Sequence, residues 1–119
     1  MKRLEDRLHE QVWNALRYAL PADAVCTSHE NRQNGIREGA RRKRRGCLAG
    51  WPDIQIIWNS RTYLIELKAP GGGSLSSVQK DMHERIERAG GSVAVCRSVD
   101  GVLNYLSACG LPMRGAVMA

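Results

Sequence analysis

The sequence predicts an α/β fold in which a small mixed β-sheet is covered by helices. Two apolar runs, residues 54–58 and 62–67, are joined by residues 59–61, which is the pattern of a β-hairpin with antiparallel strands. A helical pattern then separates this hairpin from a third apolar run at residues 93–96. Because a strand–helix–strand step of this length forms a parallel crossover, we expect the same sheet to contain parallel strands as well.

Length, charge and cysteine spacing limit the class of protein. The 119 residues fit a single domain spanning residues 1–119. A net charge of +6 and a pI near 9.6 favour a polyanionic partner, nucleic acid first and an acidic membrane surface second. The four cysteines form no CxxC pair, so we expect free thiols in a reduced, cytoplasmic protein. No apolar run is long enough to span a bilayer, and no membrane insertion is expected.

The first half of the chain begins with an amphipathic helix that Pro21 ends. Its apolar positions recur at helical spacing: Leu4, Leu8, Val12, Ala15, Leu16 and Ala19. Ala24–Ser28 is predicted to be a short strand. A long basic loop is expected over about residues 30–50, because this stretch is rich in Asn, Gly and Arg and shows no period.

The second half of the chain continues after a glycine break at residues 71–73. Residues 76–79, Ser-Ser-Val-Gln, have the form of a helix-capping box, and Gly90-Gly91 ends the helix that follows. Val93–Cys96 is the fourth predicted strand, and Val99–Ala108 is a last helix. A loosely held tail is expected over about residues 111–119.

Three charged residues stand at the ends of the predicted hairpin strands. Asp53 precedes the first strand, and Glu66 and Lys68 share one face of the second because strand side chains alternate. If Trp58 and Thr62 flank the turn, Asp53 lies opposite Leu67. A register shift of one residue instead places Asp53 across from Glu66 or Lys68. The hairpin therefore predicts one charged cluster at its open end.

This cluster has the composition of a phosphodiester-hydrolysing site. Two close carboxylates do not both stay ionised unless a cation joins them, and Mg²⁺ prefers carboxylate and carbonyl oxygens. Lys68 beside such an ion is positioned to hold or activate a water molecule. The structural alternative is an ion pair at the end of a sheet, because a Pro-Asp pair followed by Glu-x-Lys is a short and degenerate pattern.

The arrangement resembles the PD-(D/E)xK nuclease superfamily, and most of all its VRR-NUC family of virus-type replication and repair nucleases. The resemblance covers most of the chain and rests on four stretches: Gly50–Ile54, Ile65–Lys68, Leu75–Gln79 and Gly90–Ser98. It implies a restriction-endonuclease-like core with the order helix, strand, strand, strand, helix, strand, helix. It also implies a nuclease activity.

Residue roles follow from this resemblance. Asp53 and Glu66 are expected to be metal ligands with the Leu67 backbone carbonyl as a third, and Lys68 is expected to orient or deprotonate the attacking water. The cofactor is expected to be Mg²⁺ or Mn²⁺. Gln79 matches a glutamine of the family's site, although the capping box by itself already explains a glutamine there.

The family also places a glutamate of the first helix near the metal, and Glu5 and Glu10 are the two candidates. At about 100° per residue, Glu5 falls within the apolar stripe of that helix and Glu10 points away from it. Helix phase therefore favours Glu5, as a further catalytic residue and metal ligand.

The densest charge of the chain precedes Asp53 and consists of Arg37, Arg41, Arg42, Lys43, Arg44 and Arg45. We expect these residues to contact DNA phosphates. A solvated loop and a nuclear-localisation signal are the alternatives. The three histidines, among them His83, show no metal spacing and are expected at the surface. Trp51 and Trp58 are candidates for base stacking, with packing in the hairpin core as the alternative.

Together these features predict an Mg²⁺- or Mn²⁺-dependent deoxyribonuclease that hydrolyses DNA phosphodiester bonds, and the resemblance to the superfamily implies that a 5′-phosphate is left. Structure-specific endonuclease cleavage of flaps or branched DNA such as a Holliday junction is expected, because the length leaves no room for a module that reads sequence. A homodimer is expected by analogy with the family, in the cytoplasm, or in the host cytoplasm if the chain is viral. The alternatives are a non-catalytic nucleic-acid-binding domain of the same fold and an RNA nuclease.

Overall fold

The computed structural model describes residues 2–29 and 36–115 of the chain. The elements, in chain order, are α1 (Lys2–Ala19), β1 (Val25–Ser28), α2 (Ile36–Arg44), β2 (Ile54–Trp58), β3 (Arg61–Leu67), α3 (Ser77–Arg88), β4 (Ser92–Cys96) and α4 (Val99–Ala108). The predicted order of helices and strands is confirmed, and α2 is an additional helix within the segment that was expected to be a loop.

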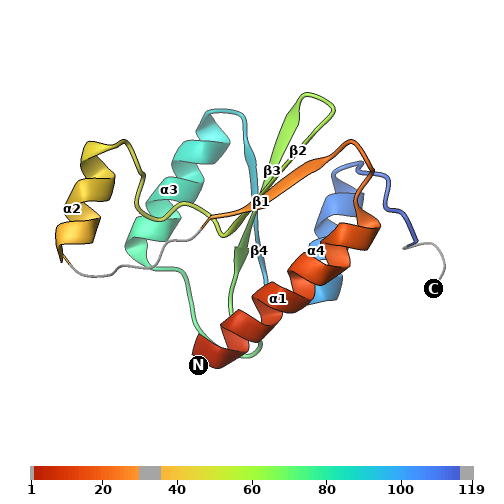
Figure 1. The fold of residues 1–119 in the computed structure, drawn as a ribbon, viewed down its shortest axis with the longest axis horizontal. Helices are drawn as coiled ribbons and strands as arrows, with labels where there is room; N and C mark the ends of the chain where they lie inside the picture. The colour runs from red at the N-terminus through yellow and green to blue at the C-terminus, as the bar shows by residue number, and fades with distance from the viewer. Residues whose placement is uncertain (1, 30–35, 116–119) are drawn as a thin grey trace.

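The strands form one mixed sheet in the order β1-β2-β3-β4 (Figure 1). The two pairings that involve β2 are antiparallel, and β4 lies parallel to β3 as the crossover through α3 requires. Helices α1 and α4 pack together on one face of this sheet, and α3 packs on the other. The β-α-β step therefore places the start of α3 near the end of β3.

The hairpin between β2 and β3 differs by one residue from the expected register. Its turn consists of Asn59 and Ser60 with φ angles of 50° and 64°, so Trp58 pairs with Arg61 rather than Thr62. Two central residues with positive φ define the tight turn that matches strand twist. With Ile54 paired to Ile65, the next step along both strands places Asp53 opposite Glu66. The register shift that the sequence left open is thus the one that brings the carboxylates together.

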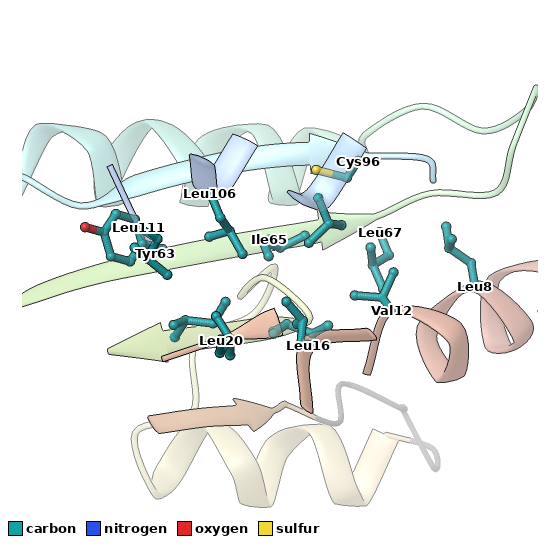
Figure 2. Close-up of a cluster of buried hydrophobic side chains, with 13 residues drawn as sticks. Leu8, Val12, Leu16, Leu20, Tyr63, Ile65, Leu67, Cys96, Leu106 and Leu111 are labelled. Carbon is teal, nitrogen blue, oxygen red and sulfur yellow. The ribbon is translucent and has the colours of Figure 1, made fainter. Parts of the chain in front are cut away.

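Most of the hydrophobic core lies between the sheet and the pair α1 and α4 (Figure 2). Leu8, Val12 and Leu16 of α1 are buried there, as the helical spacing of the sequence predicts. A smaller cluster on the other face joins Leu64 of β3 to Met82 and Ile86 of α3. The two clusters cover β3 on both faces, so its residues Tyr63–Leu67 are all buried.

Helix α2 corrects the prediction of a loop over residues 30–50. Glu38 in its first turn lies 4.0 Å from Arg41 and 3.7 Å from Arg42, at i+3 and i+4 spacing. An acidic first turn and a basic last turn also complement the helix dipole. The basic run is therefore compatible with a helix, and the lack of a hydrophobic period did not indicate a loop in this segment. Residues 30–35 of the predicted loop lie outside the described ranges.

The predicted loose tail is wrong for its first part. Leu111 is buried in the main core, and Arg114 donates hydrogen bonds from its backbone N and its Nε to the carbonyls of Ala19 and Leu20, both at 2.6 Å. These bonds satisfy carbonyls at the end of α1 that have no partner within the helix. Residues 116–119 of the expected tail lie outside the described part of the chain.

The cysteines within the described residues are free thiols, as expected. Burial raises the pKa of both Cys26 and Cys96 to about 11, which keeps these thiols protonated and unreactive. Across residues 2–29 and 36–115, no helix is both long and apolar enough to cross a membrane.

Candidate active site

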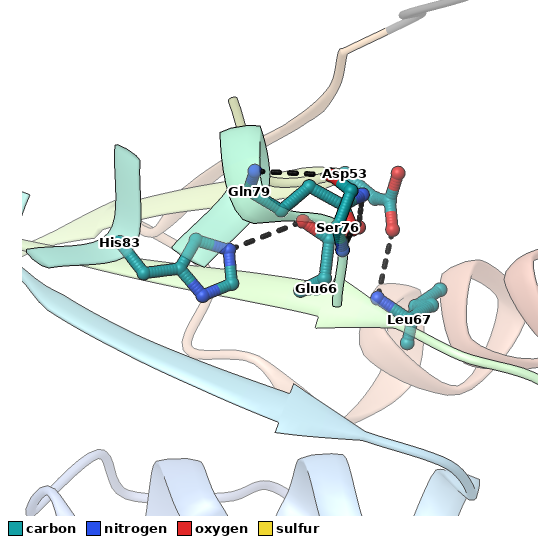
Figure 3. A network of polar contacts seen from close by, with 6 residues as sticks. All are labelled: Asp53, Glu66, Leu67, Ser76, Gln79 and His83. Atoms are coloured by element: carbon teal, nitrogen blue, oxygen red, sulfur yellow. Dashed lines mark hydrogen bonds and ion pairs between the residues drawn. The ribbon is translucent and has the colours of Figure 1, made fainter. Parts of the chain in front are cut away.

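Asp53 is fixed at the mouth of the β2–β3 hairpin. It follows the buried Pro52, and its carbonyl accepts a hydrogen bond of 2.8 Å from the backbone N of His29. Its Oδ2 atom accepts a 2.7 Å hydrogen bond from the backbone N of Leu67 on the neighbouring strand (Figure 3). The carboxylate is thus held against the end of β3, beside Glu66.

Gly50 allows the segment before Asp53 to approach α3 closely. Its φ angle is +80°, and a Cβ atom at this position would lie 2.7 Å from the carbonyl oxygen of Val78. Any other residue would meet both the strain of positive φ and a backbone clash. The glycine therefore brings the chain that leads to Asp53 against the first turn of α3, where Gln79 lies.

Glu66 is the most deeply buried charged residue of the site, with 2% of its surface exposed. Its Oε2 atom accepts a 3.3 Å hydrogen bond from Nε2 of Gln79, and its Oε1 atom lies 3.2 Å from Nε2 of His83 (Figure 3). Burial, followed by a hydrogen bond with Asp53 and the repulsion of its charge, raises the pKa of Glu66 to about 9, although Lys68 opposes this shift. Without an additional cation, Glu66 is therefore protonated at neutral pH.

Gln79 has both roles that the sequence left open, as a helix-capping residue and as a contact of the candidate site. Its Oε1 atom accepts from the backbone N of Ser76 at 3.0 Å, and the Oγ atom of Ser76 accepts from the backbone N of Gln79 at 3.1 Å. This is the predicted capping box of α3. The remaining amide nitrogen is the group that donates to Glu66. The helix cap and the contact with the candidate site are thus made by one side chain.

Lys68 and Glu5 act on Glu66 through their charges. Lys68 is half-buried one residue beyond β3, and its ammonium lowers the pKa of Glu66. Glu5 is half-buried on α1, and its carboxylate raises that pKa. Glu10, the alternative carboxylate of the same helix, is exposed. The structure thus places Glu5 within electrostatic reach of the pair, in the region that helix phase predicted.

The donor set at Asp53 and Glu66 fits a hard divalent cation that keeps water ligands. Within the described residues, no group of three or more His, Cys, Asp or Glu side chains is arranged to hold a metal. Mg²⁺ in proteins is commonly bound through one or two carboxylates with waters completing its octahedron, so two side chains and the predicted Leu67 carbonyl suffice. Burial first, and then Asp53, raise the pKa of Glu66, and a divalent ion would favour its ionised form.

His83 is a residue of the site that the sequence analysis wrongly expected at the surface. It is 8% exposed, and its ring faces Glu66. Burial lowers the pKa of His83, so its imidazole is neutral near pH 7. The signal that identifies it is its position four residues after Gln79, because residues at this spacing share a helix face.

Arg97 is a second residue to which the sequence analysis gave no individual role. Its guanidinium donates to the carbonyls of Ala69, Gly72 and Gly73, at 3.0 Å for Ala69 and 2.7 Å for Gly73. These carbonyls belong to the connection between Lys68 and α3. One planar donor group thus fixes the loop beside the candidate site.

The basic residues that precede Asp53 in the chain do not lie beside the carboxylates of Asp53 and Glu66. All except Arg45, which directly follows the helix, lie on α2, which stands beyond α3 at one end of the molecule (Figure 1).

The tryptophans have structural contacts: Nε1 of Trp58 donates to Asp23 at 2.9 Å, and Trp51 packs against the Leu64 cluster with its ring edge-to-face with His29. The packing alternative therefore holds for Trp58.

A mixed sheet with Asp53 directly before β2, Glu66 on the adjacent strand β3 and Lys68 two residues further on is the organisation expected of a PD-(D/E)xK nuclease core. Comparison with known proteins narrows this class. The VRR-NUC domain model matches residues 1–100, and the chain therefore belongs to the VRR-NUC family of nuclease domains. A solved structure described as a VRR_NUC domain protein has the same fold, with a TM-score of 0.68 at 22% identity over 88% of this chain and 86% of the other. No curated protein matches the chain.

Proposed function

We propose that this chain is a metal-dependent endonuclease that hydrolyses DNA phosphodiester bonds. The observation that carries the proposal is the pairing of Asp53 and Glu66 at the mouth of the hairpin, where Glu66 is buried beside Gln79 and within the field of Lys68. A purely structural ion pair would not require two carboxylates so close that one must be protonated. This arrangement is costly for the fold and suited to a divalent ion.

Each residue of the site then has a distinct task. Asp53, Glu66 and the Leu67 carbonyl would hold Mg²⁺ or Mn²⁺, with Glu5 as a further ligand. Such an ion would supply Lewis-acid chemistry, offsetting negative charge at the phosphate and favouring deprotonation of a water molecule. Lys68 orients or deprotonates the attacking water through Nζ. Attack of the water oxygen on phosphorus in line with the P–O3′ bond breaks that bond, so the 3′-oxygen leaves as a hydroxyl and the other fragment keeps a 5′-phosphate.

Structure-specific cleavage of flap or branched DNA, including Holliday junctions, by a homodimer is the second part of the proposal. The net charge of +6 and the exposed basic helix α2 support a phosphate-binding surface separate from the carboxylates. A surface of this kind contacts the DNA backbone without reading bases. Two copies would present two sites to two strands of a branched substrate.

The test is cleavage of labelled flap, junction and linear duplex DNA and of a matched RNA, with Mg²⁺, Mn²⁺ or EDTA. The wild-type protein and Glu10→Gln, which removes an exposed carboxylate of α1, are expected to cleave alike. Asp53→Asn and Lys68→Ala are expected to lose at least 100-fold in rate. Cleavage that persists in EDTA would refute metal dependence, and preference for the RNA would identify an RNA nuclease. Binding without cleavage under any condition would favour the non-catalytic domain.

A further inference from the structure

We propose that His83 is a positioning residue that fixes the carboxylate of Glu66 for metal binding. This inference rests on the proposed function, because it concerns how Glu66 is held toward the divalent ion. The observation behind it is that α3 contacts both oxygens of one buried carboxylate, Gln79 at Oε2 and His83 at Oε1.

The two contacts together determine the plane of the carboxylate. Gln79 and His83 lie one helical turn apart on the same face of α3, so their polar groups reach Glu66 from two positions along the helix axis. The last torsion of a glutamate side chain is broad and allows the carboxylate to rotate. One donor would leave that rotation free, whereas a contact to each oxygen stops it. His83 is therefore the second anchor that Gln79 alone does not provide.

The contacts leave room on both oxygens for a metal. An ionised carboxylate has about four lone-pair sites, and one contact at each oxygen uses two of them. With an N–H at Nε2, His83 would donate to Oε1 of the ionised carboxylate across the 3.2 Å contact and so orient it as a ligand.

Packing alone does not account for an imidazole at this position. Met82 and Ile86, on the neighbouring part of α3, belong to an apolar cluster, whereas the ring of His83 faces the carboxylate of Glu66. A buried imidazole is costly unless its polar atoms are satisfied, and His83 is 8% exposed with its Nε2 atom on Glu66. The charged groups that act on the ring are Glu87, Asp53 and Lys68, two of which belong to the candidate site.

The experiment compares direct Mn²⁺ binding, measured by electron paramagnetic resonance without DNA, in wild type, His83→Leu and His83→Gln. Leucine fills the buried volume without a hydrogen bond, and glutamine supplies an amide donor in place of the imidazole. His83→Leu is expected to fold normally by circular dichroism and to bind Mn²⁺ about 10-fold more weakly or worse. His83→Gln is expected to bind within about 3-fold of wild type. If His83→Leu does not fold, His83→Met provides the same comparison with a more adaptable side chain.

Wild-type Mn²⁺ affinity in a folded His83→Leu protein would overturn the inference, and so would equal weakening in His83→Gln. Asp53→Asn serves as the reference for the metal site itself. If Asp53→Asn abolishes Mn²⁺ binding and His83→Leu does not change it, only the role of His83 fails. If wild type does not bind Mn²⁺, or Asp53→Asn binds it as wild type does, the proposed metal site fails as well. In cleavage assays, His83→Leu should raise the Mg²⁺ concentration for half-maximal rate, whereas a merely smaller folded fraction would leave it unchanged.

Discussion

The Nε2 atom of Gln79 lies 3.3 Å from Oε2 of Glu66, while the oxygen of the same amide accepts from the backbone N of Ser76. The capping bond therefore determines which end of the amide faces the carboxylate. Because α3 begins at this cap, the start of the helix and the orientation of the buried glutamate depend on one another. Substitutions that remove the contact of the amide nitrogen while keeping the contact of the amide oxygen, or the reverse, can test this dependence.

Gln79→Glu should keep the helix cap and lose the contact with Glu66. A glutamate at this position supports a capping box as well as a glutamine, but it presents a carboxylate where Nε2 donates. We expect cleavage to fall at least 10-fold, with thermal stability near that of wild type.

The matched control is Ser76→Ala, which removes the hydroxyl that accepts from Gln79 and keeps the backbone N that orients the amide. It should cost about 1 kcal/mol of stability and leave cleavage nearly unchanged. Equal loss of activity in both variants would mean that Gln79 acts only through the helix cap.

The metal-free protein should lose stability as the pH rises through the neutral range. Burial first, and then Asp53, raise the pKa of Glu66 from 4.5 to about 9 in the folded state. A group with a raised folded pKa contributes most stability below its unfolded pKa, and this contribution is lost as the pH approaches the folded value. Urea unfolding in EDTA should therefore show a decrease between about pH 5 and about pH 8, on the order of 4 kcal/mol.

Glu66→Gln isolates this contribution, because glutamine resembles the protonated acid. The variant should be more stable than wild type in EDTA at about pH 8, and the difference should shrink toward about pH 5. Adding Mn²⁺ should stabilise wild type and leave Glu66→Gln nearly unaffected. Parallel pH profiles for the two proteins would show that Glu66 is ionised in the metal-free fold.

Three arginines of α2 should account for most of its contribution to DNA binding. Arg37, Arg41 and Arg44 are exposed and follow i, i+4, i+7 spacing, which places them in one row along the helix. Both Arg41 and Arg42 lie within 4.0 Å of Glu38, but Arg42 is half-buried and is left unchanged. Replacing the three exposed arginines with glutamine should weaken binding to every DNA sequence alike, as measured by fluorescence anisotropy. The slope of log K against log salt should decrease by about 2 to 3.

The control for this change is a triple substitution that removes the same charge from exposed arginines outside α2: Arg17, Arg61 and Arg88. If binding depends only on the net charge of +6, the two triple variants will weaken equally. A larger effect of the α2 variant would identify the helix as the phosphate-binding surface. Cleavage of a saturating substrate should stay near the wild-type rate in both variants, because neither changes the carboxylates.

The limits of prediction from sequence are clear at three positions. Strand alternation is enough to place Glu66 and Lys68 on one face, but the position of Asp53 depends on the turn. Asn59 and Ser60 both have positive φ, a conformation that serine rarely adopts, so the tight turn could not be recognised from residue types. His83 lies one turn after Gln79, yet its burial follows only from the packing of α3 on β3. Local spacing predicts which charged side chains share a strand face, and tertiary packing decides which side chains they contact.

Gly50→Ala should disturb the site at a distance from its charged groups. The added Cβ would lie 2.7 Å from the carbonyl oxygen of Val78, and the alanine would have to adopt a φ of +80°. To relieve the clash, the segment that leads to Asp53 must move away from the first turn of α3. We expect a loss of about 1–3 kcal/mol in unfolding free energy and a decrease in cleavage rate beyond the loss of folded protein.

The matched control is Gly39→Ala in α2, where an added Cβ would meet no other atom within 4 Å. Alanine is favoured over glycine inside a helix, so this variant should be as stable as wild type or up to about 1 kcal/mol more stable. Cleavage per folded molecule should stay at the wild-type level in Gly39→Ala and fall in Gly50→Ala. If both variants cleave normally once the folded fraction is measured, the approach of residue 50 to α3 serves the fold alone and does not set the position of Asp53.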